Sequence, residues 1–125
     1  MASTKEKVLA LAHQYFEDTV SNRRHLHQNP ELSFEEYNTS AFVKKQLDEL
    51  GIPYEAKADT GIVALIKGDL PSDEVIALRA DMDALPIQEV EGRSYGSNTP
   101  GVMHACGHDV HTSSLLGTAK ILNSL

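Results

Sequence analysis

The sequence predicts an α/β fold in which helices precede short strands and a further helix follows them. Apolar residues recur at three- and four-residue steps between positions 8 and 27, as on one face of a helix. Two short runs rich in β-branched residues, 61–67 and 75–79, are typical of strands. Helical spacing returns from about Asp109 onward. A length of 125 residues fits one small domain or part of a larger one.

Two helices are predicted in the first half of the chain. The first ends near Asn29, because Pro30 disfavours helical geometry in the residue before it. The second begins at Ser33, which forms a capping box with Glu36 three residues later. Gly51 is suited to the position after the last helical residue, so the second helix should end there.

The predicted strands follow Pro53. Residues 54–58 form a short strand, and the stronger runs 61–67 and 75–79 pair as a hairpin, with 75–79 as an inner strand. Residues 81–107 are mostly irregular, and so long a loop is uncommon unless it is functional. The final helix has no stop signal before Leu125. We therefore expect the chain to be a segment of a larger domain.

Composition narrows the classes of partner. Eleven basic residues stand against 18 acidic ones, a formal charge of −7, which argues against nucleic acid as a partner. One cysteine excludes an intrachain disulfide and fits a reducing compartment. The polar start lacks the apolar core of a signal peptide, and no stretch approaches a membrane span. We expect a cytoplasmic protein that binds neither nucleic acid nor membrane.

A first group of candidate site residues lies in 79–86 (RADMDALP), directly after a predicted strand. Binding sites in open α/β sheets form at the carboxyl ends of strands. Asp81 and Asp83 would point to opposite sides of an extended chain. One of them could then face a metal while the other pairs with Arg79 or caps a turn. The alternative is that both are ordinary loop acids.

A second group lies in 104–111 (HACGHDVH), which holds three histidines, one cysteine and one aspartate. Imidazole, thiolate and carboxylate together suit borderline-soft divalent ions. Gly107 permits a tight bend that lets Cys106 and His108 converge. A buried, inert Cys106 or a cysteine nucleophile with a histidine base are the alternatives. His25 and His27 fall on different helix faces and should not form a local site.

Three motifs occur in order: 24–33 (RHLHQNPELS), 79–86 and 103–109 (MHACGHD). Together they resemble the start of the aminoacylase and carboxypeptidase-G-like metallopeptidases. More narrowly, they resemble the branch that contains hippurate hydrolases, N-acyl-amino-acid amidohydrolases and auxin-conjugate hydrolases. The resemblance implies that residues 1–125 are the N-terminal portion of a mixed-sheet catalytic domain with a two-metal site. It also implies a smaller inserted domain, absent here, that often mediates dimerisation.

The resemblance further implies site roles. Cys106 and His108 would be metal ligands, and Asp83 would orient a metal-bound histidine. Asp81 stands where many relatives carry a metal-binding histidine, so its role stays open. The implied reaction is hydrolysis of N-acyl amino acids with two divalent ions (Mn, Zn, Ni or Co) and a catalytic glutamate later in the chain. We expect residues 1–125 alone to be inactive. The alternative is a non-catalytic, shortened family member that acts as a metal-binding or interaction module.

Overall fold

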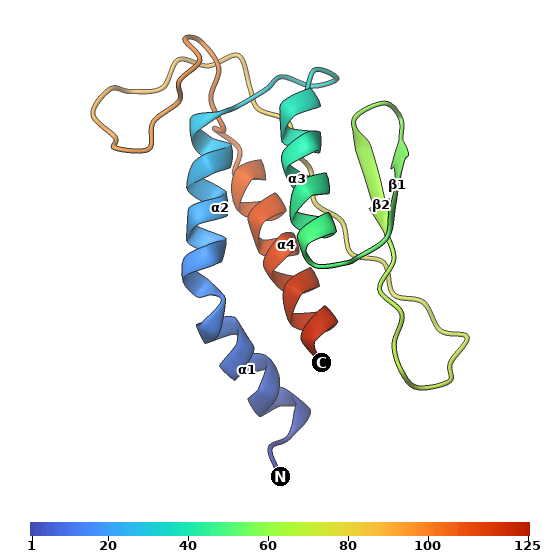
Figure 1. Cartoon of the computed structure of the whole chain (residues 1–125). Helices are drawn as coiled ribbons and strands as arrows, with labels where there is room; N and C mark the ends of the chain where they lie inside the picture. The colour runs from blue at the N-terminus through green and yellow to red at the C-terminus, as the bar shows by residue number, and fades with distance from the viewer.

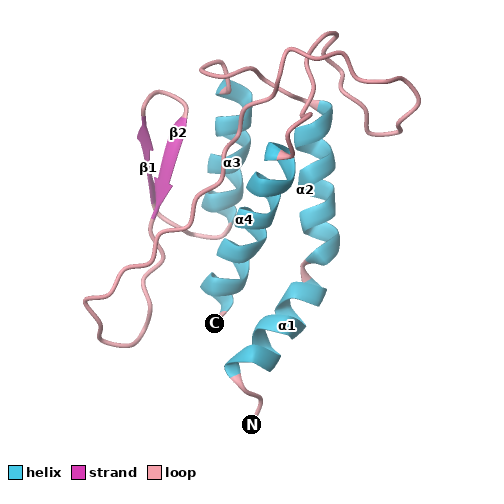
Figure 2. Cartoon of the chain, turned by 180° about the vertical axis from the view of Figure 1, so that it is seen from behind, coloured by secondary structure: helices cyan, strands magenta, loops and turns pink.

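The computed structural model describes residues 1–125 as four helices and one small sheet. The elements are α1 (Thr4–Gln14), α2 (Phe16–Gln28), α3 (Tyr37–Glu49), β1 (Tyr54–Lys57), β2 (Gly61–Ala64) and α4 (His108–Ser124). α4 lies between α2 and α3, and the β1–β2 hairpin lies beside α3 (Figures 1 and 2). The helices α3 and α4 run opposite to α2, so the C-terminal end of α2 and the start of α4 meet at one end (Figure 1). None of these helices is long and apolar enough to cross a membrane.

The first predicted helix is in fact two helices, separated at Tyr15. Tyr15 leaves helical geometry with φ −96° and ψ 4°. The hydroxyl of Thr19 donates to its carbonyl at 3.1 Å, a type of bond that bends helices. The predicted end of the helical segment is confirmed, because α2 ends at Gln28 and Asn29 is its C-cap.

The predicted capping box at Ser33 and Glu36 is wrong. The helix begins at Tyr37, and its N-cap, Glu36, makes no side-chain cap bond. The hydroxyl of Ser33 donates instead to Asp83 Oδ2 at 2.7 Å. Glu31 accepts from the free backbone N–H of Asn38 at 3.1 Å and so takes over the capping role. The predicted end is confirmed, since Gly51 follows the C-cap with φ 68°.

The strands differ from the prediction in their pairing. β1 pairs antiparallel with β2, with Tyr54 opposite Ala64 and Lys57 opposite Gly61. Residues 75–79 form no strand, and Ile76 is 87% exposed. A strand needs a neighbouring backbone to accept and donate its hydrogen bonds. No other strand of residues 1–125 lies beside 75–79, so this apolar run stays unpaired.

The apolar core is small and lies between α3, α4 and the residues that follow α3. It is formed by Val43, Leu47, Ile52 and Leu116. Of the 17 buried residues, ten are polar or charged and six are hydrophobic residues of the core. Buried polar groups are costly unless they are hydrogen-bonded. The stability of the packed helices therefore depends on hydrogen bonds between buried polar groups as well as on apolar burial.

Candidate metal centre

The long irregular segment 81–107 is confirmed, and it is tied to the rest of the molecule at defined points. The backbone N–H of Ala84 donates to the carbonyl of Glu31 at 2.7 Å. Leu85 and Met103 exchange two backbone hydrogen bonds of 2.9 and 3.0 Å. These hydrogen bonds hold the segment beside the start of α4. They place Asp81 and Asp83 beside the first turn of that helix.

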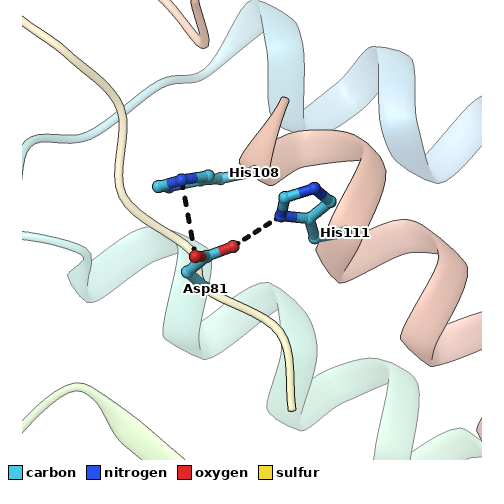
Figure 3. A group of neighbouring side chains, drawn as sticks. All are labelled: Asp81, His108 and His111. Carbon is cyan, nitrogen blue, oxygen red and sulfur yellow. Dashed lines mark hydrogen bonds and ion pairs between the residues drawn. The ribbon is translucent and has the colours of Figure 1, made fainter. Parts of the chain in front are cut away.

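Asp81 meets two histidines from the first turn of α4 (Figure 3). His111 Nδ1 donates to Asp81 Oδ1 at 2.7 Å, and His108 Nε2 lies 3.4 Å from Asp81 Oδ2. One ligand atom from each of the three residues lies within 4.8 Å of the others. The backbone is fixed as well, because Thr112 Oγ1 donates to the carbonyl of Asp81 at 2.7 Å. The three side chains therefore converge on one small volume.

Asp83 holds the opposite edge of the His108 ring. His108 Nδ1 lies 2.9 Å from the backbone carbonyl of Asp83 and 2.9 Å from its Oδ1. A carbonyl oxygen only accepts, so Nδ1 must carry a hydrogen. Nε2 can then be the unprotonated nitrogen of a neutral ring, which is the form that binds a metal. Asp83 is itself held by the hydroxyl of Ser33 at 2.7 Å.

Both aspartates are stabilised as carboxylates. The hydrogen bond from His111 holds the pKa of Asp81 below its usual range, against the opposing effect of burial. The hydrogen bond from Ser33, followed by that from His108, lowers the pKa of Asp83 in the same way. Hydrogen bonding to the charged form favours that form. The site therefore presents fixed negative charge on both sides of His108.

Cys106 lies close to this group in sequence but is not one of its three members. Its side chain is exposed. Gly107 has φ 88°, so the predicted tight bend before His108 is present. His104 is buried, and both of its ring nitrogens lack a hydrogen-bond partner. Burial lowers the pKa of His104, because it disfavours the charged ring.

The donor set fits a divalent ion of the transition series. Asp81 offers carboxylate oxygen, and His108 and His111 offer imidazole nitrogen, a mixture that suits zinc and its neighbours. His108 also has the carboxylate partner that ligating histidines commonly use on their other nitrogen. Sequence reasoning did not single out His111 as a ligand. The available signal was its spacing of three residues from His108 on a helix that starts there.

A second polar cluster lies behind this centre and was not predicted. His27, near the end of α2, is 1% exposed. Its Nδ1 lies 2.8 Å from Asp109 Oδ2, and its Nε2 lies 2.7 Å from Glu89 Oε1. Arg23 Nε also donates to Asp109 Oδ2, at 2.9 Å. As expected, His25 does not join His27; it stacks on Phe42 at 4.3 Å between ring centroids.

Sequence and structure comparisons find relatives over nearly the whole chain. Residues 77–125, which include every metal candidate, match the model of peptidase family M20/M25/M40. An N-acyl-L-amino acid amidohydrolase of Geobacillus stearothermophilus is 48% identical over 98% of this chain and 33% of its own length. An IAA-amino acid hydrolase of Arabidopsis thaliana is 49% identical over 91% of this chain and 26% of its own length.

A solved structure extends the match to the fold. The YXEP protein of Bacillus subtilis, described as a dinuclear metal-binding peptidase of the M20 family, superposes with a TM-score of 0.84. It is 44% identical, and the match covers 90% of this chain and 32% of that one. The chain thus spans between about a quarter and a third of the length of the proteins that it matches. In its motifs, sequence identity and fold, the chain is thus similar to members of peptidase family M20/M25/M40.

Proposed function

We propose that this chain contributes to a metal-dependent amidohydrolase that cleaves the amide bond of N-acyl amino acids. The observation that carries the proposal is the setting of His108, whose Nδ1 is engaged by Asp83 while its Nε2 faces Asp81 and His111. The relatives named for N-acyl-L-amino acid and IAA-amino acid hydrolysis support the substrate class. An acyl group joined to an amino acid is the substrate we propose.

Each residue of the site has a role in the proposal. Cys106 and His108 are ligands to the metal centre, with Mn, Zn, Ni or Co as the candidate ions. Asp83 orients His108, and Ser33 in turn holds Asp83. Asp81 and His111 present further donor atoms to the same volume. When bound, two such ions would polarise the amide carbonyl and lower the pKa of a bound water.

The proton transfer requires a base that these residues do not provide. Hydrolysis needs a group that takes a proton from water and delivers it to the leaving amine. Glu89 is the buried glutamate of segment 81–107, but it is engaged by His27 and by the backbone N–H of Ser97. We therefore propose that the catalytic glutamate is not among residues 1–125. It would lie in a region that corresponds to the part of the relatives that this chain does not match. Residues 1–125 alone should then show no turnover.

A chimera tests the proposal. The chain would replace the corresponding third of the Geobacillus stearothermophilus relative, and hydrolysis of a panel of N-acetyl amino acids would be measured with added Mn or Zn. We expect turnover by the chimera, none by residues 1–125, and loss of turnover in the Cys106→Ala and His108→Ala chimeras. His25→Gln, an exposed change on α2, is the matched control and should leave turnover unchanged.

Two results would count against the proposal. A folded chimera without hydrolysis of any N-acyl amino acid would contradict the substrate class. Full activity in the Cys106→Ala chimera would remove Cys106 from the metal centre. Turnover by residues 1–125 alone would show that the base lies within them.

A further inference from the structure

The cluster around His27 joins three segments that are distant in sequence. His27 belongs to α2, Glu89 to segment 81–107 and Asp109 to the first turn of α4. The exposed fractions of their side chains are 1%, 6% and 0%. Both ring nitrogens of His27 lie within 2.8 Å of a carboxylate oxygen. The ring therefore bridges two acids whose side chains are almost entirely buried.

The number of hydrogens on the His27 ring determines the charge of the bridge formed by Glu89, His27 and Asp109. An ionised carboxylate only accepts hydrogen bonds, and a neutral imidazole carries a single N–H. Both carboxylates also accept hydrogen bonds from other groups. Glu89 accepts from the backbone N–H of Ser97, and Asp109 accepts from Arg23 and from the backbone N–H of Val110. Two N–H groups on the His27 ring satisfy all of these contacts at once.

The bridge acts on the helix end that carries the metal candidates. α4 starts at His108 after Gly107, which makes no side-chain cap bond. Asp109 is the acidic residue of the first turn, and its carboxylate is held by His27 and Arg23. A carboxylate at a helix N-terminus is favoured by the helix dipole. Since Asp109 is the neighbour of His108, fixing Asp109 fixes the backbone from which His108 projects.

We propose that His27 is a positioning residue. As an imidazolium between Glu89 and Asp109, it fixes the first turn of α4 and so the direction in which His108 presents Nε2. The effect on metal affinity rests on the proposed function, whereas the charge of His27 and the orientation of His108 do not. His27 itself touches neither substrate nor metal in this scheme.

Two amide variants test the contact of His27 with Asp109 and its contact with Glu89 separately. The Asn side chain in His27→Asn places a donor near the former Nδ1 and can keep the contact with Asp109. The Gln side chain in His27→Gln places a donor near the former Nε2 and can keep the contact with Glu89. If positioning acts through Asp109, the Asn variant should retain it and the Gln variant should lose it. His25→Gln, two residues away on an exposed face, is the control.

The first measurement is nitrogen-15 NMR of the histidine rings in the metal-free 125-residue protein. We expect both ring nitrogens of His27 to carry hydrogen. We also expect the hydrogen-bonded Nδ1–H of His108 to persist in His27→Asn and to be lost or shifted in His27→Gln. A neutral His27 ring would overturn the charge assignment. An unchanged His108 signal in both variants would overturn the positioning role.

The second measurement is Zn²⁺ titration, corrected for the folded fraction by circular dichroism. We expect His27→Gln to bind Zn²⁺ about 10-fold more weakly, because losing a direct partner of a ligand costs about 10-fold to 100-fold and His27 acts one contact further away. His27→Asn and His25→Gln should stay close to the original protein. Equal affinity of all folded variants would reduce His27 to a folding role. If the original protein binds no Zn²⁺, the proposed metal centre fails in this chain, and the His108 signal still decides the positioning role.

Discussion

The start of α4 and the segment 61–78 differ in the kind of side chain that is buried and the kind that is exposed. Around α4, polar residues are buried and partnered: His27, Asp109 and Ser113 are each 1% exposed. Within 61–78, several large apolar residues are exposed, and Leu70, Val75 and Ile76 are 84–87% exposed. The buried polar residues at the start of α4 find hydrogen-bond partners in α2, in α4 itself and in segment 81–107. No part of residues 1–125 covers these side chains, and exposed apolar patches commonly mark contact sites.

The largest effect is expected at Asp109. Asp109→Ala leaves His27 and Arg23 without their shared acceptor, and breaking a buried ion pair costs about 3–5 kcal/mol. Urea unfolding followed by circular dichroism measures the loss. The control is Asp18→Ala, because Asp18 is 64% exposed in its pair with Lys120 and should contribute at most about 1 kcal/mol. Equal losses in the two variants would refute the distinction.

A smaller effect is expected where α4 crosses α2, at Gly117. A Cβ atom added there would lie 2.8 Å from Thr19 Oγ1. Gly117→Ala should therefore destabilise the protein by about 1–3 kcal/mol, the usual range for overpacking. Without the clash, alanine in a helix would stabilise by up to about 1 kcal/mol. The double variant with Thr19→Ala should recover stability, and a purely additive double-mutant cycle would contradict the packing account.

The next prediction concerns acid stability. The hydrogen bond from His27, followed by that from the backbone of Ser97, lowers the pKa of Glu89 from its usual value of 4.5. A carboxyl group with a lowered folded-state pKa stabilises the fold above pH 4.5 and loses that contribution as pH falls through the folded-state value. Glu89→Gln should flatten the pH dependence of unfolding below pH 4.5, and an unchanged slope would contradict this assignment.

The smallest effect on stability is expected in the exposed segment. Ile76→Ser should change the free energy of unfolding by no more than about 0.5 kcal/mol, because Ile76 is 87% exposed. The same variant should reduce light scattering at high protein concentration, since it interrupts an exposed apolar run. A loss above about 2 kcal/mol, as for a buried side chain, would show that 75–79 is covered in solution.

Where a local rule governs the backbone, the sequence predicted the structure. Pro30 constrains the residue before it, so the end of α2 at Gln28 was predictable. Gly51 and Gly107 both adopt positive φ, as a helix end and a tight bend require. The density of metal-binding residue types in 104–111 likewise indicated the region of the candidate site.

Where a residue had alternative partners, only the tertiary structure decided among them. Ser33 could have capped a helix, but Asp83 lies within reach and accepts its hydroxyl. Residues 75–79 have the composition of an inner strand but no neighbouring strand to pair with. His27 looked like an ordinary helical histidine until α2 and α4 placed it between Glu89 and Asp109. Local composition limits what a side chain can bind, whereas the energy of a contact depends on partners that the fold brings from 50 to 82 residues away.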